Sequence, residues 1–231
     1  MKNQVIFTDL SQIDYKEAWD HQEMLFKKSV DLKIAHRKGE TTDLPQNHLL
    51  FCEHPHVYTL GKSGSEQNLL ISEAILKQKN ASYYKINRGG DITYHGPGQL
   101  VAYPILDLDR FFTDIHKYMR FLEEAVILTI RHFGIEGDRV EGSTGVWLDV
   151  GTPKERKICA MGVKSSRWVT MHGLALNVNP NMDYFNNIVP CGITDKSVTS
   201  MEKELDKSIS LAEVKPILKA NLAEVFNFSY Q

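Results

Sequence analysis

The sequence has little of what marks a secreted or membrane-spanning protein. Only three residues are cysteine, Cys52, Cys159 and Cys191, and no two of them form a CxxC pair. A framework of structural disulfides is therefore not expected, and the reducing cytoplasm is the predicted location. No stretch approaches the roughly 20 apolar residues of a membrane-spanning helix. The opening MKNQVIFTDL also lacks the apolar core of a signal peptide.

An excess of charge of either sign is also missing. The formal net charge is -2, so no overall field favours binding to nucleic acid or to an anionic membrane. Hydrophobic residues make up 42% and charged residues 24% of the chain, which is typical of a globular protein. The length allows one sizeable core, and we expect a single domain over residues 1–231.

Strands and helices are mixed along the chain rather than segregated. The apolar patterns predict helices at 14–36, 72–79, 114–133 and 211–226, and strands at 5–7, 48–52, 83–86, 100–106, 144–148, 157–164 and 168–178. This order predicts an α/β fold of the α+β type, with a mixed β-sheet flanked by helices and adjacent hairpins over 144–178. Ser210 and Glu213 form a capping box, yet Pro216 follows. The last helix therefore either begins nearer Pro216 or is kinked.

Glycine and polar side chains gather in the stretch RGGDITYHGPGQ, residues 88–99. It is too long and too polar for a tight hairpin turn, so it is predicted to be a loop. Its glycines permit positive φ and a close approach of ligand to backbone, and their N–H groups could form a nest for an anion. Arg88 and His95 could face one cavity. A purely structural loop is the alternative, but we favour ligand binding.

Two further segments carry potential catalysts. Lys157 and Lys164 bound an apolar strand and differ by an odd number, so alternation places them on opposite faces, and at most one is expected in a given pocket. Cys191 lies between proline and glycine, in a bend that suits a nucleophile. Cys52 and Cys159 lie in apolar strands and are interpreted as structural.

A metal site is not predicted. The stretch from Cys52 to His56, CEHPH, holds four potential ligands. Zinc sites usually draw ligand pairs from two separate segments. His172 with Cys191 could form a second pair, but nothing specific in the sequence supports it. The stretch is interpreted as the end of a strand and a turn.

Four pieces of the chain, RGGDITYHGPGQ, KICAMG, HGLALNVN and PCGI, occur in the order and spacing of the lipoyl(octanoyl) transferase family, which the sequence closely resembles. The resemblance implies the fold of the biotin and lipoate ligase catalytic domain. It implies transfer of an octanoyl group from acyl carrier protein to a lysine of lipoyl domains, in 2-oxoacid dehydrogenase complexes and the glycine cleavage H protein. It implies no cofactor and no ATP, because the acyl group arrives on the phosphopantetheine of acyl carrier protein.

The resemblance also implies roles for individual residues. Cys191 would form the acyl-enzyme, and Lys157 rather than Lys164 would be the catalytic lysine. The substrate-binding residues would be Arg88, Gly89, Gly90, Asp91, Ile92, Thr93, Tyr94, His95, Ala160, Met161, Gly162, Gly173, Leu174 and Ala175. Residues 164–171 read KSSRWVTM, less basic than in many relatives, which leaves contacts with the acceptor there open.

Three other functions remain open at this point. An ATP-dependent ligase of the same superfamily would need no cysteine nucleophile. A non-enzymatic acyl-binding protein would form no covalent adduct. A papain-like hydrolase would need a histidine beside the cysteine, for which His95 or His172 could serve.

Overall fold

The computed structural model describes residues 2–189 and 197–231. Its strands are β1 (Asn3–Gln12), β2 (Asn47–Glu53), β3 (Val57–Leu60), β4 (Ser82–Lys85), β5 (Ile92–His95), β6 (Gln99–Ile105), β7 (Val146–Leu148), β8 (Arg156–Ser166), β9 (Val169–Asn177), β10 (Ser197–Val198) and β11 (Phe228–Tyr230). Its α-helices are α1 (Tyr15–Arg37), α2 (Glu73–Gln78), α3 (Ile115–His132), α4 (Met201–Leu205) and α5 (Leu211–Val225). Short 3-10 turns are η1 (Glu66–Asn68), η2 (Leu108–Arg110) and η3 (Met182–Asn187).

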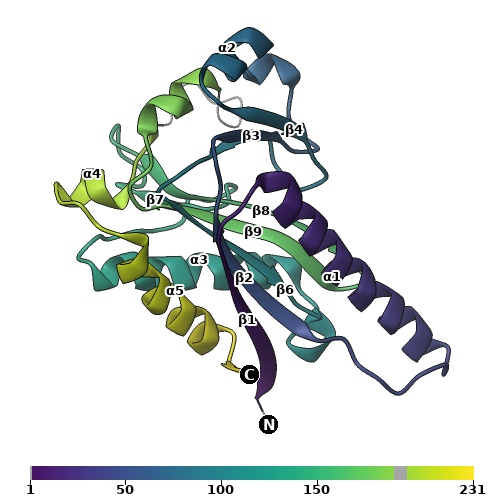
Figure 1. Cartoon of the computed structure of the whole chain (residues 1–231). Coiled ribbons are helices and arrows are strands. Elements are labelled where there is room, and N and C mark those ends of the chain that lie inside the picture. Colours follow the sequence, from purple (N-terminus) through teal and green to yellow (C-terminus); the bar gives the residue numbers. More distant parts are fainter. Residues whose placement is uncertain (1, 190–196) are drawn as a thin grey trace.

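These strands build two sheets (Figure 1). The large sheet has the order β10-β8-β9-β6-β2-β1-β11, with β7 paired to β8 off this path. It is mixed, because β1 is parallel to β2 and β11 while β2, β6, β9 and β8 pair antiparallel. The small sheet has the order β4-β3-β5. The predicted mixed sheet flanked by helices is confirmed, as are the hairpins over 144–178, since β7, β8 and β9 pair antiparallel.

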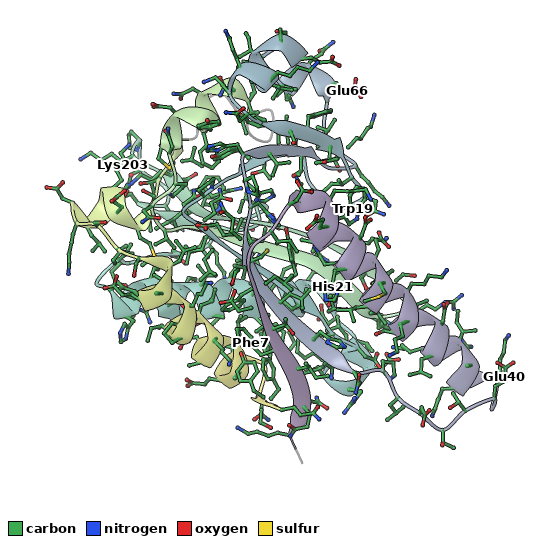
Figure 2. All side chains as sticks on the ribbon, in the orientation of Figure 1. Phe7, Trp19, His21, Glu40, Glu66 and Lys203 are labelled. Atoms are coloured by element: carbon green, nitrogen blue, oxygen red, sulfur yellow. The ribbon has the colours of Figure 1, made fainter. Side chains whose placement is uncertain are left out.

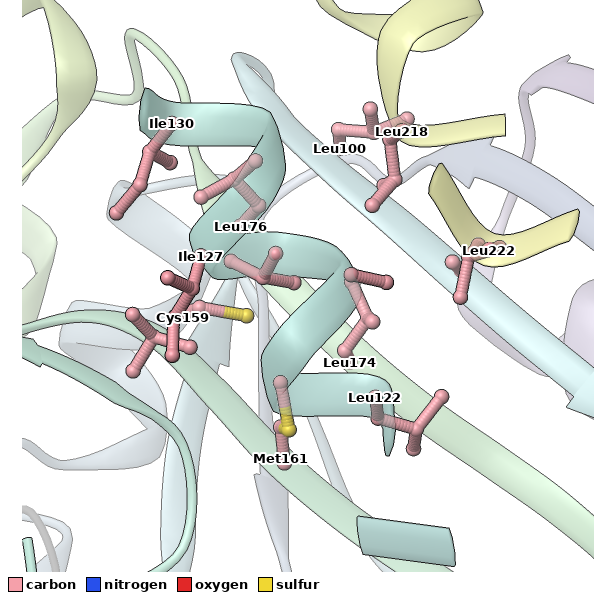
Figure 3. Close-up of a cluster of buried hydrophobic side chains, with 14 of the residues drawn as sticks. Leu100, Leu122, Ile127, Ile130, Cys159, Met161, Leu174, Leu176, Leu218 and Leu222 are labelled. Carbon is pink, nitrogen blue, oxygen red and sulfur yellow. The ribbon is translucent and has the colours of Figure 1, made fainter. Parts of the chain in front are cut away.

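Helices cover both faces of the large sheet (Figure 1). Figure 3 shows Leu122 and Ile130 of α3 over Leu174 and Leu176 of β9, and Leu218 of α5 beside Leu100 of β6. On the other face, α1 contributes Ala18 and Phe26 to a second core. Burial of each large aliphatic side chain contributes about 1.5–3 kcal/mol, so these two layers hold the sheet in place.

The prediction that Cys52 and Cys159 have a structural role is confirmed. Cys159 lies in the core under α3, and Cys52 lies in the core under α1. Both are buried, and burial raises the pKa of each thiol. Thiolate is the reactive form of cysteine, so neither of these side chains is placed to react.

The predicted long helices agree with the structure to within a residue or two at each end. The capping box of Ser210 and Glu213 is formed, so α5 begins at Leu211 and runs through Pro216. The alternative start nearer Pro216 is therefore wrong. Proline has no N–H, so the carbonyl of Ala212 lacks its usual helical partner. No helix among the described residues has the length and apolar character to cross a bilayer.

One prediction about 88–99 is wrong in part, because Ile92–His95 is strand β5 rather than loop. It pairs antiparallel with β3, a strand that the sequence did not suggest, and β3 pairs in parallel with β4. Val57–Leu60 directly follows the CEHPH stretch that was interpreted as a turn, and Ile92–His95 lies inside the glycine stretch, so neither stood out as a strand. Their stability comes from pairing and from the buried side chains of Tyr58 and Tyr94.

Candidate active site

A cavity of about 100 Å³ lies where the small sheet and the start of α1 meet strands β6, β9 and β8. It brings together the predicted residues Arg88, Gly90, Asp91, Ile92, Thr93, His95, Lys157, Ala160, Met161, Gly162, Gly173, Leu174 and Ala175. Its other lining residues are Tyr15, Gln99, Val101, Tyr103, Thr144, His172, Asn177, Phe185 and Val198. Figure 2 shows Trp19 on the first turns of α1, the part of the helix that approaches the small sheet.

Two predicted site residues, Gly89 and Tyr94, are not among those that line the cavity. The N–H of Gly89 donates to the carbonyl of Val163 (3.0 Å) and ties the glycine stretch to β8. The fully buried Tyr94 forms a hydrogen bond with Nδ1 of His56 (2.7 Å) and stacks on Tyr184. Cys191 lies outside the described residues.

The glycines of the stretch serve close packing more than anion binding. A Cβ at Gly162 would lie 2.9 Å from the carbonyl oxygen of Gly89, so β8 needs a glycine there for the stretch to lie against it. Gly98 has a φ of +89° and its N–H donates to a carboxylate oxygen of Glu53 (2.7 Å). The N–H groups of Gly89 and Gly98 are thus already donated within the protein, and the predicted nest is wrong for these two.

Arg88 holds the small sheet and the glycine stretch together. Its Nη2 donates to the carbonyl (2.7 Å) and hydroxyl (2.9 Å) of Thr59, and its Nη1 donates to the carbonyl of Gly89 (3.0 Å). The side chain is buried, so its charge acts on its neighbours through little water. It contributes to the lowered pKa of His95 and of His172.

The buried His95 and His172 line the cavity, and the ring of the buried His54 lies 6.0 Å from that of His95. Burial lowers the pKa of His54 to about 4 and that of His172 to about 3. Burial, together with His54 and Arg88, holds the pKa of His95 well below its usual value. All three rings are therefore neutral at pH 7, and none is poised to become the imidazolium that a papain-like cysteine–histidine pair uses.

The histidines of the CEHPH stretch have other partners. Nδ1 of His54 donates to the carbonyl of Ile13 (2.9 Å), and its Nε2 accepts from the hydroxyl of Tyr103 (2.8 Å). The ring of His56 stacks on Tyr184 at 4.0 Å. Across residues 2–189 and 197–231, no group of three or more potential ligands is placed to hold a metal ion.

The histidine at position 54 should make stability depend on pH. The folded state keeps the ring neutral down to about pH 4, whereas the unfolded chain takes up a proton below about pH 6.5. Between those values the unfolded state binds one more proton, so the free energy of unfolding falls as pH falls, by up to about 1.4 kcal/mol per pH unit. We expect His54→Gln to reduce this slope by about that amount, measured by urea unfolding between pH 6.5 and 4.5.

His116, exposed on α3, provides the control for this measurement. His116→Gln removes a histidine at the surface and away from the core, so it should change the free energy of unfolding by no more than about 0.5 kcal/mol. Equal slopes for the unmodified protein and His54→Gln would contradict the assignment of a neutral buried ring at position 54.

A bulge in β8 places Lys157 at the cavity. Trp147 pairs with Lys157 and Val146 pairs with Cys159, which leaves Ile158 as an extra residue. Ile158 and Cys159 both pack into the core under α3. The extra residue reverses the alternation at this point, so Lys157 returns to the face that carries Ala160.

The prediction that Lys157 and Lys164 lie on opposite faces is therefore wrong. Distance along the strand separates them instead, because seven residues of strand span roughly 20 Å. Lys164 pairs with Glu23 of α1 (3.1 Å) and does not line the cavity. The prediction that at most one lysine lies in the pocket is confirmed.

The surroundings of Lys157 are fixed by three elements. Its Nζ lies 4.4 Å from the ring centroid of Trp147 in β7. Gly145, before that strand, has a φ of +100°, and its N–H donates to the buried carboxylate of Glu123 on α3 (3.1 Å). The carbonyl of Lys157 accepts from the N–H of Thr199 (2.9 Å), so the chain that follows β10 is held beside this lysine.

The described residues on both sides of 190–196 reach the same cavity. Before this segment, the N–H of Val189 donates to the carbonyl of Asn68 (2.9 Å), and Phe185 of η3 lines the cavity. After it, Val198 pairs with Lys157 and also lines the cavity. The cavity thus combines an amine, buried hydrogen-bonding groups and apolar walls, a combination suited to an acyl group joined to a polar carrier.

Comparisons with known proteins agree with this arrangement. Residues 14–223 match the family model described as the lipoyl protein ligase A/B catalytic domain. An octanoyltransferase of Christiangramia forsetii is 64% identical over 98% of this chain and 97% of its own.

Solved structures show the same fold at low identity. A bipartite lipoate protein ligase of Thermoplasma acidophilum, studied with its E2 lipoyl domain, has a TM-score of 0.70 at 16% identity, covering 100% of this chain and 86% of its own. A biotin protein ligase of Aquifex aeolicus has a TM-score of 0.51 at 14% identity, covering 98% of this chain and 70% of its own. The fold expected from the four sequence pieces is therefore confirmed.

Proposed function

Because this chain belongs to the lipoyl protein ligase A/B catalytic domain family, and within it to the octanoyltransferases, we propose that it transfers an octanoyl group from acyl carrier protein to a lysine of lipoyl domains. The acceptors are those of 2-oxoacid dehydrogenase complexes and the glycine cleavage H protein. The observation that carries the proposal is the single cavity at which Lys157 meets the residues of three motif segments. Octanoyl transfer makes the chain an acyltransferase.

The reaction takes two steps. In the first, the Cys191 thiolate attacks the carbonyl carbon of the octanoyl thioester, a new C–S bond forms, and the bond to the phosphopantetheine sulfur breaks. Lys157 takes the thiol proton of Cys191 and returns it to the departing thiolate. One thioester replaces another, so this step is nearly balanced in free energy.

In the second step, the amine of the acceptor lysine attacks the acyl-enzyme carbonyl. An amide forms, the Cys191 sulfur leaves, and a proton from the amine restores the thiol. The acceptor lysine is mostly protonated near neutral pH, with an ordinary pKa of about 10.4. A general base is therefore required, and Lys157 is the amine that the described residues place at the cavity.

The acyl chain occupies the apolar part of the cavity. Ile92, Val101, Met161 and Leu174 contribute walls from three strands and the glycine stretch. Each buried methylene contributes about 0.8 kcal/mol, so the length of this apolar part selects among acyl chains. Both steps exchange one acyl bond for another, so no nucleotide, metal or other cofactor enters the proposal, and the expected location remains the cytoplasm.

Intact mass spectrometry tests the proposal. The protein is mixed with octanoyl-acyl carrier protein without ATP, beside a Cys191→Ser control. We expect the mass of one octanoyl group on the unmodified protein, removed by neutral hydroxylamine and, separately, by an added lipoyl domain. The Cys191→Ser protein should carry no hydroxylamine-labile adduct.

Three other outcomes would replace the proposal. Turnover only with free octanoic acid and ATP would indicate a ligase and would remove the role of Cys191. Release of free octanoic acid in place of transfer would indicate a hydrolase. Tight binding of the octanoyl thioester without any adduct would indicate an acyl-binding protein.

A further inference from the structure

A chain of buried hydrogen bonds crosses the floor of the cavity. Gln99, the last residue of the glycine stretch, donates from Nε2 to the carbonyl of Tyr94 (3.1 Å) and to Oδ1 of Asn177 in β9 (2.8 Å). Asn177 in turn donates from Nδ2 to the carbonyl of Thr199 (2.9 Å). Oε1 of Gln99 lies 3.1 Å from Nδ1 of His95. Neither amide was singled out from the sequence.

The direction of each of these hydrogen bonds follows from the two backbone carbonyls, those of Tyr94 and Thr199, to which the side-chain amides donate. Backbone carbonyls can only accept, so the contacts with Tyr94 and Thr199 fix which end of each amide carries nitrogen. Both N–H groups of Gln99 are then used, and its oxygen must accept from His95. The proton of the neutral His95 ring is therefore assigned to Nδ1.

The second nitrogen of His95 is left as an acceptor. Among the described residues the hydrogen bond to Gln99 engages Nδ1 and leaves Nε2 for a ligand, and His95 lines the cavity. The His95 ring stacks on the Tyr15 ring, with the ring centroids 5.9 Å apart and an angle of 10° between the planes. It also makes a T-shaped contact with the His54 ring, with the centroids 6.0 Å apart. These two contacts restrict rotation of the His95 ring. Gln99, Asn177 and His95 are all buried, so a broken bond in the chain would leave a polar atom unpaired away from water.

We infer that Gln99 and Asn177 are positioning residues, which hold His95 as its Nδ1–H tautomer so that Nε2 accepts a hydrogen bond from an N–H group of the bound substrate. The inference rests on the proposed function, because that function supplies two such groups. One is an amide of the phosphopantetheine arm, and the other is the amine of the acceptor lysine. The neutral ring, kept so by burial and by Arg88, suits an acceptor of hydrogen bonds rather than a base.

The tautomer can be measured directly by nitrogen-15 NMR of the imidazole rings, with His95 assigned by the signal lost in His95→Gln. We expect the pattern of a protonated Nδ1 and an unprotonated Nε2. His54 is an internal reference, because its Nδ1 donates to the carbonyl of Ile13. In Gln99→Leu the His95 signals should shift toward a mixture of tautomers while those of His54 stay in place. A purely structural role for Gln99 would not move the tautomer.

Single-turnover kinetics identify which N–H group His95 binds. We expect Gln99→Leu to slow one half-reaction by about tenfold, the effect of one lost hydrogen bond. Slower formation of the acyl-enzyme would assign the phosphopantetheine amide, and slower transfer to the lipoyl domain would assign the acceptor amine. Asn179→Leu is the control, because Asn179 donates a similar bond to the carbonyl of Ile209 (2.8 Å) outside this chain. Its two half-reactions should stay within about twofold of the unmodified protein.

Several results would overturn the inference. A proton on Nε2 in the unmodified protein would do so without any variant. Equal rates for Gln99→Leu and Asn179→Leu in both half-reactions would also do so. If Gln99→Leu does not fold, Gln99→Met replaces it, because an unbranched side chain of similar length removes the amide acceptor for Nδ1 together with the donors to Tyr94 and Asn177. Failure of the unmodified protein to form an acyl adduct would instead refute the proposed function. The tautomer of His95 measured by NMR does not depend on that outcome.

Discussion

Octanoyl transfer by Lys157→Ala should be slower by about a thousandfold, within the range that a positioned general acid–base group contributes. The substitution removes the amine at the cavity but leaves the backbone contacts of the strand. The carbonyl of residue 157 still accepts from Thr199, and β8 still pairs with β9 and β10. The variant should therefore fold, with the loss confined to the rate. The measurement is single-turnover transfer from acyl carrier protein to a lipoyl domain, together with thermal unfolding.

Two further variants separate the role of the proton from the role of the charge. Lys157→Arg keeps a cation but cannot act as a base, because arginine stays protonated. It should be as slow as the alanine variant if Lys157 moves a proton. Lys164→Ala is the matched control on the same strand, where the lysine pairs with Glu23 and lies over the ring of Phe26. It should keep its rate within about twofold, as surface ion pairs contribute little. Full activity of Lys157→Ala would end the assignment.

Long periodic segments were predictable from the sequence because their pattern repeats many times. The stripe of apolar residues over 114–133 repeats through five turns, and α3 covers Ile115–His132. Strands β3 and β5 offer only four residues each. They form because they pair with each other, and pairing between segments some 35 residues apart leaves no local periodicity to read.

Residues that line the cavity were predictable where they belong to a sequence motif. They were not predictable where only the tertiary fold brings them to the cavity. The four ordered sequence pieces identified the family, and the family match confirms it. Tyr15 reaches the cavity from the first turn of α1, and nothing in its sequence surroundings indicates this. The face of Lys157 depends on the bulge at Ile158, whereas alternation assumes a regular strand. Gln99 and Asn177 did stand within the quoted motifs, so their amides could have been noticed there.

Removal of the Glu123 carboxylate should produce a large loss of stability. Glu123 is fully buried on α3, accepts from the N–H of Gly145 (3.1 Å), and pairs with Arg120 (3.0 Å) and Arg139 (3.1 Å). Burial raises the pKa of its carboxyl, so the charge itself costs desolvation that the pairs offset. We expect Glu123→Ala to lower the free energy of unfolding by about 3 kcal/mol, because it leaves a cavity, an unpaired buried N–H and two arginines without their buried carboxylate.

Two neighbouring substitutions show where that loss comes from. Glu124→Ala removes the other carboxylate of Arg139, but that side chain is 40% exposed, so we expect a loss of at most about 0.5 kcal/mol. Glu123→Gln keeps an acceptor for Gly145 and should lose about 1 kcal/mol. Urea unfolding measures the free energy of unfolding of all three variants.

The same substitutions should affect the transfer rate, because Gly145 adjoins Lys157: a Cβ at Gly145 would lie only 3.5 Å from Cε of the lysine. Glu123→Ala should therefore slow transfer more than Glu123→Gln does. Equal losses for Glu123→Ala and Glu124→Ala would mean that the buried carboxylate does not hold this loop against Lys157.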